Sequence, residues 1–438
     1  MLKILANRTY RHLFLAQVIA LVGTGLATVA LGLLAFDLAG AQAGAVLGTA
    51  LAIKMTAYIG VAPIAAAFAE RLPRRAMLVS LDLVRALVAL ALPFVTEVWQ
   101  IYVLIFVLQS ASAAFTPTFQ ATIRDILPDE DDYTRALSLS RLAYDLESVA
   151  SPMLAAALLT VISFHNLFAG TVIGFLASAA LVSTVLLPKA KQTPRRSIYE
   201  RTTRGMRIFL ATPRLRGLLA LNLTVAAASA MVIVNTVVLV QSHFALPQSS
   251  TALALAAFGG GSMVAALVLP RLLKDIKDRT AMLFGGGILV IGLAVGINLT
   301  TYNFLLPLWM VLGMGYSLAQ TPSGRLLRRS AHAEDRPALF AAQFALSHAC
   351  WLITYPLAGW LGANISLTAS FVGLAVVAGS ALVVSIVIWR PAHDQESIKH
   401  THENLPDDHT HFDGQEGADH EHPYVIDDQH RRWPDRRP

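Results

Sequence analysis

The sequence has little charge and almost no cysteine. Of its 438 residues only 14% are Asp, Glu, Lys or Arg, against roughly a quarter in an ordinary soluble protein. The single cysteine, Cys350, excludes a disulfide framework and a Cys-rich zinc module. With 55% hydrophobic residues and a mean hydropathy of +0.56, the chain carries more apolar surface than a water-soluble fold could bury. Its solvent is therefore largely lipid.

Signatures of common enzyme classes are also missing. The sequence contains no Walker loop, no His-Glu-x-x-His and no Gly-x-Ser-x-Gly, and the glycine run 285–287 lacks the Lys-Ser/Thr that a phosphate loop requires. ATP is therefore not expected to drive this protein directly. We expect no enzymatic activity, no cofactor and no nucleic-acid partner.

Long apolar runs recur along the chain. Each is about 20 residues or more, the length that crosses a bilayer, and together they predict an all-α integral membrane protein with twelve transmembrane helices. The expected spans lie near 13–36, 43–69, 76–95, 99–121, 136–162, 167–187, 214–241, 248–273, 280–301, 303–327, 338–361 and 368–389.

Lys and Arg gather in alternate loops. Basic residues precede the first span and occupy the loops after every second one, whereas the loops near 37–42, 96–98, 163–166, 242–247, 302 and 362–367 contain none. Because positively charged loops stay in the cytoplasm, this pattern predicts a multi-pass protein of the cell membrane with both termini cytoplasmic.

The two halves of the chain repeat each other. Thr116-Pro117 recurs as Thr321-Pro322, and Pro152 recurs as Pro356, at offsets of 205 and 204 residues. A six-plus-six repeat places a substrate site near the membrane midplane, between the halves. We therefore expect a six-helix bundle over 1–187, a cytoplasmic linker over 188–213, a second six-helix bundle over 214–390 and a tail over 391–438.

The tail differs sharply from the body. Residues 391–438 hold 12 Asp/Glu against 5 Lys/Arg and 8 of the 13 histidines, and so few apolar residues predict disorder. Imidazole with nearby carboxylate suits borderline divalent ions such as nickel, cobalt and zinc, and the alternative is a solvated acidic tail. The candidate metal ligands form three His-x-His pairs: His400, His402, His409, His411, His420 and His422.

The loop between the second and third spans, residues 66–75 (AAFAERLPRR), carries a family resemblance. It resembles the motif of the major facilitator superfamily, although Ala66 and Pro73 stand where that motif has glycines, and Glu70 where it has aspartate. The resemblance implies a major facilitator fold and a gating role for Glu70, Arg71 and Arg75, with Arg124 as their charge partner. The alternative is that these charges only set the orientation.

A narrower resemblance concerns the fourth span and the loop after it. The segments 115–120 (FTPTFQ) and 127–130 (LPDE) resemble proton-driven exporters. With its His-rich tail, the chain is most similar to nickel and cobalt resistance exporters. This resemblance implies divalent metal ions and protons as partners, beside the lipid bilayer.

Polar residues within the spans form helical stripes. Ser140, Tyr144, Glu147 and Ser151 share one face, and Cys350 lies on the matching face of the other half. Since unpaired polar groups in hydrocarbon are costly, these stripes should face a cavity. Glu147 could carry a proton, bind metal or make a helix contact.

Six further residues of the predicted transport path lie within the spans. Asp145 has Arg141 one turn earlier, which favours a structural ion pair, as do Asp82 and Arg85 for each other. Lys54 has no local partner and needs a carboxylate from another helix or a wet cavity. Two remaining candidates are His348 and Met314, for which ordinary packing is the alternative. The last two are Gln109 and Asn235, which lie on helices that border the cavity in the superfamily that the chain resembles.

These observations predict a secondary transporter that exports nickel or cobalt from the cytoplasm by proton antiport with alternating access. One alternative keeps the transporter and changes the cargo to a hydrophobic drug or siderophore, with the His-rich tail as a metal sensor. Another is a membrane receptor that transports nothing and signals through its tail.

Overall fold

The structure is a computed structural model of the chain. It describes residues 2–69, 72–187, 198–273, 275–332, 334–394, 397–401, 419–427, 430 and 432–434. Within these ranges a few helical side chains, Arg141 and Asp145 among them, are not described.

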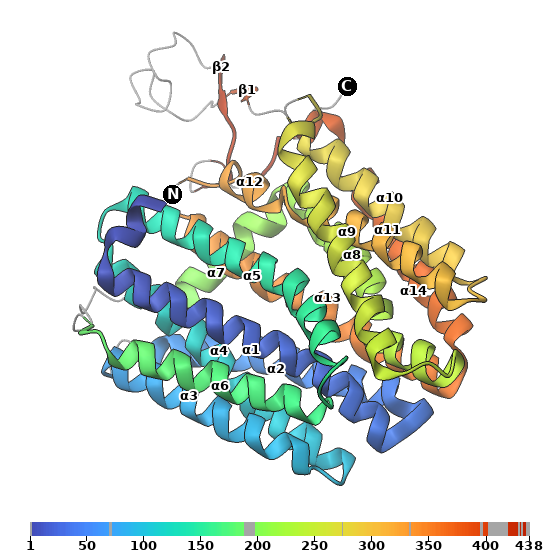
Figure 1. Cartoon of the computed structure of the whole chain (residues 1–438). Helices are drawn as coiled ribbons and strands as arrows, with labels where there is room; N and C mark the ends of the chain where they lie inside the picture. Colours follow the sequence, from blue (N-terminus) through green and yellow to red (C-terminus); the bar gives the residue numbers. More distant parts are fainter. Residues whose placement is uncertain are drawn as a thin grey trace.

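Twelve helices of membrane-spanning length form two sets of six (Figure 1). The N-terminal half contains α1 (Arg8–Ala39), α2 (Ala43–Ala69), α3 (Arg74–Ala91), α4 (Val98–Ile126), α5 (Glu130–Leu158) and α6 (His165–Ser183). The C-terminal half contains α8 (Pro213–Val237), α9 (Gln248–Leu272), α10 (Asp278–Gly296), α11 (Tyr302–Gln320), α13 (Arg336–Asn364) and α14 (Leu367–Ile388). The predicted all-α fold is confirmed.

Hydropathy alone finds most of these spans. Ten stretches of the described chain are long and apolar enough to cross a membrane, and the first of them covers both α1 and α2. α5 is not among these stretches, because its acidic and basic residues continue from Glu130 as far as Glu147. Polar residues of a spanning helix must face protein or water, so α5 belongs to the interior of the assembly.

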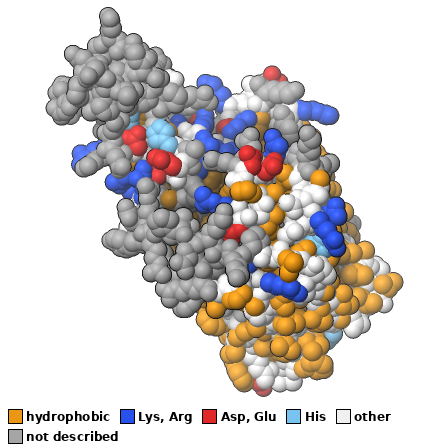
Figure 2. Space-filling model, turned by 90° about the vertical axis from the view of Figure 1, so that its left-hand side faces the viewer, with side chains coloured by type: hydrophobic (Ala, Val, Ile, Leu, Met, Phe, Trp, Pro, Cys, Tyr) orange, Lys and Arg blue, Asp and Glu red, His pale blue; other side chains and the backbone are white. Residues whose placement is uncertain are grey.

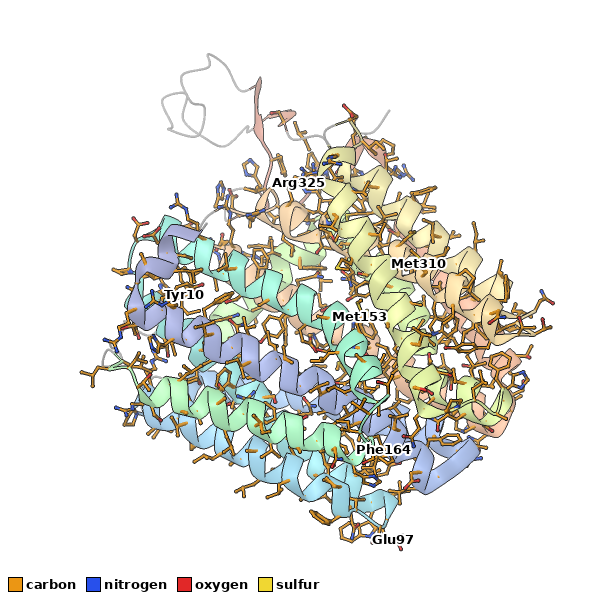
Figure 3. The ribbon with its side chains drawn as sticks, viewed as in Figure 1. Tyr10, Glu97, Met153, Phe164, Met310 and Arg325 are labelled. Carbon is orange, nitrogen blue, oxygen red and sulfur yellow. The ribbon has the colours of Figure 1, made fainter. Side chains whose placement is uncertain are left out.

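The two ends of the bundle differ. We call "terminal end" the end that holds the start of α1, the short helix α12 (Ser323–Arg328) and the last described residues, and "opposite end" the other one. In Figure 3 Tyr10 and Arg325 lie toward the terminal end, and Glu97 and Phe164 toward the opposite end. The ribbons of the two halves converge at the opposite end and diverge toward the terminal end (Figure 1).

Glycines bring the halves together at the opposite end. α2 packs against α13, and α5 packs against α9. A Cβ on Gly359 of α13 would overlap the carbonyl oxygen of Gly44 on α2, and a Cβ on Gly48 would lie 2.5 Å from the carbonyl oxygen of Tyr355. Nearby, Gln42 Nε2 donates to the carbonyl of Ala363 at 3.2 Å. This end is closed by backbone contact between the halves.

Part of the predicted linker is helical. α7 (Ile198–Ala211) packs along α13, where a Cβ on Gly205 would overlap the carbonyl of Ala338. Arg204 holds the contact with a salt bridge to Asp335, in which Nη2 donates to Oδ2 at 2.9 Å. The second half of the linker is therefore attached to the C-terminal half.

One expected span is broken. The run 303–327 was predicted as a single helix, but α11 ends at Gln320 and α12 begins at Ser323, on either side of Thr321-Pro322. Proline lacks an N–H and crowds the preceding turn. The equivalent Pro117 lies within an unbroken α4, so the same dipeptide has different effects in the two halves.

Large apolar side chains cover much of the outside. Leu87 of α3, Ile173 of α6, Phe284 of α10 and Val376 of α14 are each more than 60% exposed. Figure 2 shows hydrophobic side chains gathered over the lower part of the visible face and charged ones above them. Such an apolar surface fits a multi-pass membrane protein.

Part of the tail pairs and packs in the structure. Residues Ser397–Thr401 (β1) and Asp419–Pro423 (β2) form an antiparallel pair, and Tyr424, Val425 and Ile426 are buried. Disorder over 391–438 stays a prediction, and within that range these described residues pair and pack as stated. A short apolar run within a polar tail supplies a core that overall composition conceals.

Closure of the opposite end can be tested by adding one methyl group at the contact. Gly359→Ala should weaken closure, because overpacking against backbone costs about 1–3 kcal/mol. Disulfide cross-linking between Gln42→Cys and Ala363→Cys, with Cys350→Ser as background, should fall several-fold. Gly60→Ala is the control, since no atom lies within 4 Å of its Cβ position. Equal cross-linking in Gly359→Ala and in the Gly60→Ala control would contradict the interpretation.

Candidate functional site

A buried ion pair on α3 has a structural role. Asp82 is fully buried, forms a salt bridge with Arg85 and accepts a 2.7 Å hydrogen bond from Ser178 Oγ. The guanidinium of Arg85 lies 4.3 Å from the ring centroid of Phe115 and 4.5 Å from that of Phe175. The predicted pairing of Asp82 with Arg85 is confirmed, and every strong contact that it makes holds the N-terminal half together.

Lys54 and Glu147 form the charged centre of the structure. Lys54 lies on α2 and Glu147 on α5, and the charge of each acts on the other. Among the described residues Lys54 Nζ and the carboxylate oxygens of Glu147 form no salt bridge, which would require a nitrogen–oxygen distance of at most 4.0 Å. Ser151 lies one turn after Glu147 on α5, and a Cβ on Gly25 of α1 would overlap Ser151 Oγ and would lie 2.5 Å from Glu147 Oε1. The missing side chain at Gly25 makes room for the carboxylate.

Aromatic rings surround this centre and connect the halves. Tyr58, one turn after Lys54, stacks on His348 of α13 with ring centroids 5.6 Å apart and planes at 14°. Phe344, one turn before His348, lies 5.9 Å from Tyr58. Tyr144 of α5, one turn before Glu147, is 37% exposed.

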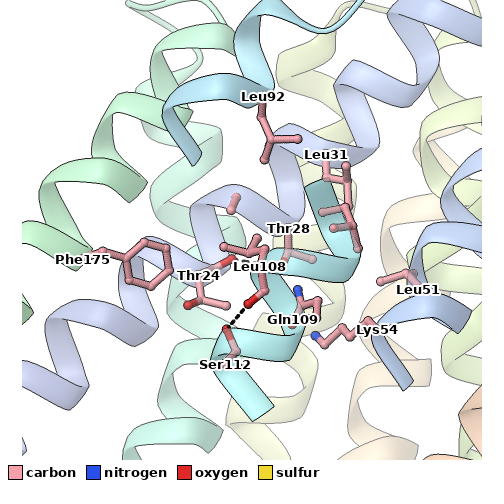
Figure 4. A pocket seen from close by; sticks show the side chains of 12 residues that line it. Thr24, Thr28, Leu31, Leu51, Lys54, Leu92, Leu108, Gln109, Ser112 and Phe175 are labelled. Atoms are coloured by element: carbon pink, nitrogen blue, oxygen red, sulfur yellow. Dashed lines mark hydrogen bonds between the residues drawn. The ribbon is translucent and has the colours of Figure 1, made fainter. Parts of the chain in front are cut away.

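A small cavity adjoins Lys54 inside the N-terminal half. Its volume is about 20 Å³, and Gln109, Thr24, Thr28 and Ser112 line it beside the lysine (Figure 4). Gln109 and Lys54, both predicted to lie on the transport path, are thus brought together. Tyr58 and Phe344 were not among the predicted site residues, although both lie one turn from a predicted site residue.

The other predicted path residues lie elsewhere. Asn235 is buried near the opposite end, where Nδ2 donates to the carbonyl of Ala358 at 3.1 Å and to Ser370 Oγ at 3.0 Å. Cys350 donates to the carbonyl of its own helix at Leu346, and Met314 is half-buried on α11. Asp145 lies on α5, but its side chain is outside the described residues.

The predicted gating motif is described only in part. Glu70 and Arg71 lie outside the described residues, Arg75 donates to the carbonyl of Ser183, and Arg124 is exposed in the last turn of α4. Sequence reasoning missed the neighbouring salt bridge between Arg74 and Asp125, 3.3 Å from Nη2 to Oδ2. That pair joins the start of α3 to the end of α4.

The C-terminal half has the same connection with opposite charges. Asp278 at the start of α10 takes two hydrogen bonds from Arg325 of α12, one of them 2.9 Å from Nε to Oδ2. Asp278 lies 204 residues after Arg74, the offset of the repeat. Arg325 follows Asp125 by only 200 residues, so the repeat keeps the position of one partner and the helices that the ion pair joins, and the two charges are exchanged.

The strand pairing brings distant tail histidines together. Register pairs His400 with His420, and His422 lies two residues further along β2. Residues opposite each other in an antiparallel pair have Cβ atoms about 5 Å apart, and residues two apart share a face. The side chains of these three histidines are outside the described part of the chain, as are His402, His409 and His411 entirely.

Residues 424–427, 430 and 432–434, here called the docked segment, pack on the C-terminal half. Arg214 at the start of α8 is buried, with Nε donating to Ser330 Oγ at 2.9 Å and its guanidinium 5.1 Å from the ring centroid of Trp433. Asp427 lies between His332 and His430, at 3.3 and 3.2 Å. Two pairs of side chains thus attach the docked segment to the terminal end.

No metal centre has formed among the residues that the structure describes, since no three His, Cys, Asp or Glu side chains come together there in a suitable arrangement. Glu147, His348 and Cys350 are therefore separate polar groups along the path.

Three comparisons with known proteins agree with this architecture. The sequence model of the Major Facilitator Superfamily matches residues 13–292 and 218–416. The chain belongs to the major facilitator superfamily. A protein of Bacillus subtilis (strain 168) described as "Uncharacterized MFS-type transporter YfiS" is 22% identical over 300 residues, which cover 64% of this chain and 69% of the relative.

Solved structures of the superfamily share the fold. A mutant form of the nucleoside transporter NupG superposes with a TM-score of 0.70 at 12% identity, over 87% of this chain and all of that one. A bacterial homologue of the human lysosomal transporter Spinster, inward-facing and occupied, gives a TM-score of 0.66 at 14% identity, over 87% and 98% of the two chains. Membership of the superfamily makes this protein a membrane transporter.

The docked segment gives a test at Asp427. Partial burial opposes ionisation of Asp427, but hydrogen bonds from His430 and His332 and the charge of His430 outweigh it and hold the pKa of this carboxyl well below its usual range. A depressed folded-state pKa stabilises docking above the unfolded pKa, and this contribution is lost only as the pH falls through the folded value.

Asp427→Asn should therefore release the docked segment at neutral pH, whereas the native segment should stay attached at about pH 4–5, near the ordinary Asp pKa of about 3.9. Cleavage of the C-terminus by trypsin at neutral pH, and hydrogen exchange in acid, would measure release. Asp37→Asn, at the exposed end of α1, is the control. Protection unchanged in Asp427→Asn would show that Asp427 does not hold the docked segment.

Proposed function

We propose that this protein is a proton-coupled exporter that works by alternating access, with both termini in the cytoplasm. The observation that carries the proposal is the pair Lys54 and Glu147, held beside the contact between the halves and next to an exposed Tyr144. Ionisable groups within membrane helices are costly and typically serve transport. Rocking of the halves would expose this centre to each side in turn.

The terminal end is then the cytoplasmic side. Closure by Gly44 and Gly359 at the opposite end keeps the extracellular route shut while cargo enters from the cytoplasm. Opening must separate these glycines and close the divergent end. Glu147 exchanges cargo for a proton during this cycle, and the Tyr58–His348 stack reports the motion because its rings come from different halves.

The walls of the centre favour an organic cargo with an apolar or aromatic body. Tyr58, Tyr144, Phe344 and His348 offer ring faces and edges, whereas a dehydrated divalent ion would require several carboxylate, imidazole or thiolate ligands at one point. The structure supplies no such group among its described residues. The His-rich tail then acts as a metal sensor beside the cytoplasmic entrance.

A second candidate is export of nickel or cobalt. The pairing of His400 with His420 favours it, because histidines from two different His-x-His motifs become cross-strand neighbours and would collect ions near the transport path. Glu147, His348 and Cys350 would then act as successive ligands during passage.

Glu147→Gln should abolish proton-driven export while leaving the protein folded, since glutamine keeps the shape and loses the titratable group. Flux in proteoliposomes under an imposed pH gradient should fall by about tenfold or more, which is about 1.4 kcal/mol or more in barrier height. Asp37→Asn removes an exposed acid and serves as control. Undiminished proton-driven flux in Glu147→Gln would remove Glu147 from the coupling mechanism.

The two cargoes can be separated in everted membrane vesicles energised with a proton gradient. An organic exporter should accumulate a lipophilic dye and ignore Ni²⁺ and Co²⁺, and removal of 391–438 should change only its response to metal. The second candidate would be established if the full-length protein accumulated Ni²⁺ or Co²⁺ and if removal of 391–438 reduced this accumulation at low metal concentration. Dye transport that competes with neither metal would reject it.

A further inference from the structure

The polar side chains that line the cavity beside Lys54 present hydrogen-bond acceptors to it. Thr24, Thr28 and Ser112 each donate their hydroxyl hydrogen to a carbonyl one turn earlier in their own helix, at 2.9, 3.0 and 3.0 Å. Their oxygens consequently offer lone pairs to the cavity. Gln109 is only 7% exposed, and its Oε1 has no hydrogen-bond partner in the described structure.

Lys54 matches this set of acceptors. An ammonium group has three donors and no acceptor, and about 20 Å³ is room for one water or for a small movement of such a group. In Figure 4 the side chain of Lys54 points toward Gln109. The apolar walls of the cavity, among them Leu51, Leu92 and Phe175, leave Lys54 as the only cation at this place among the described side chains.

The ammonium group of Lys54 therefore has two possible positions, one in the cavity beside Gln109 and one beside Glu147. It senses the charge of Glu147 but makes no contact within 4.0 Å with it in the described chain, so the structure holds the lysine in its withdrawn position. Glu147 then faces the centre without a cation in contact. A buried carboxylate needs either a cationic partner or a proton.

Resting on the function proposed above, we infer that the cargo is an organic monocation that displaces Lys54 from Glu147, and that the cavity of Gln109, Thr24, Thr28 and Ser112 receives the displaced ammonium group. The rings of Tyr58, Tyr144 and Phe344 suit such a cargo, because aromatic faces attract cations within about 6 Å.

The net charge of Lys54, Glu147 and the cargo determines how transport responds to membrane potential. With Lys54 withdrawn, ionised Glu147 and a bound monocation give the centre a net charge of one positive unit. When a proton replaces the cargo, Lys54 and neutral Glu147 carry the same net charge. One proton is exchanged for one monocation, so transport is driven by a pH gradient and does not respond to membrane potential.

The test is binding of matched ions to the full-length protein in lipid nanodiscs. Tetraphenylphosphonium and tetraphenylborate have nearly the same size and opposite charge, and only the cation should bind. Lys54→Gln removes the internal competitor and should tighten binding of the cation by about tenfold. Gln109→Leu and Lys54→Arg should weaken binding, because the cavity then no longer accommodates the cation at residue 54.

A double variant supplies the decisive control. In Lys54→Gln the added Gln109→Leu change should have no effect, since the two act only through each other. Gln120→Leu, an exposed position on the same helix, should behave as wild type. The inference is overturned if tetraphenylborate binds equally well, if the cation does not bind, or if Gln109→Leu acts equally without Lys54.

Flux measurements separate this inference from the function on which it rests. Tetraphenylphosphonium flux driven by pH and unchanged by a potassium diffusion potential supports the inference. Proton-driven flux of a neutral or anionic solute would overturn it and leave the proton-coupled exporter standing. Full activity of Glu147→Gln would overturn the exporter mechanism itself.

Discussion

A charge placed between lipid-embedded helices must find a partner, and this constraint organises the whole structure. Asp82 and Arg85 satisfy it within one helix, with Ser178 and two phenylalanine rings completing their surroundings. Lys54 and Glu147 satisfy it only across a gap between α2 and α5. The first arrangement is complete and static. The second leaves room for a proton or a solute, and for that reason we propose that the functional centre lies there.

The two halves share the arrangement of their helices but not the ionisable groups within them. Arg74 with Asp125 and Asp278 with Arg325 connect equivalent helices with opposite charges, because either order of the two signs stabilises the same junction. At the centre, by contrast, the position that holds Glu147 in one half holds Cys350 in the other, and Cys350 bonds only to its own helix. In the cycle that we propose, the two halves move as equivalent bodies, while the ionisable group belongs to one of them.

Sequence reasoning succeeded where one physical quantity dominates. Apolar length places the spans, and the stripe of Ser140, Glu147 and Ser151 predicts an inward face because hydrocarbon excludes polar groups. It failed where the outcome depends on contacts between distant segments. The stacking of Tyr58 on His348 requires knowledge of which helices meet. Pro117 and Pro322 both follow a threonine, but only the second lies at the end of a helix. Tyr424 and Trp433 pack against each other in a tail whose average composition indicates disorder.

Two buried side-chain carbonyls lack hydrogen-bond partners at the places where the transport cycle requires movement. Asn235 Oδ1 faces Gly44 and Gly362, 2.8 and 2.7 Å from where their Cβ atoms would lie, at the contact that must separate on opening. Gln109 Oε1 faces the cavity beside Lys54. A buried acceptor without a donor costs about 1–3 kcal/mol, and a rigid protein gains nothing by retaining it. In a transporter the same acceptor is satisfied when a helix or an ammonium group moves, so its cost in one state lowers the barrier to the next.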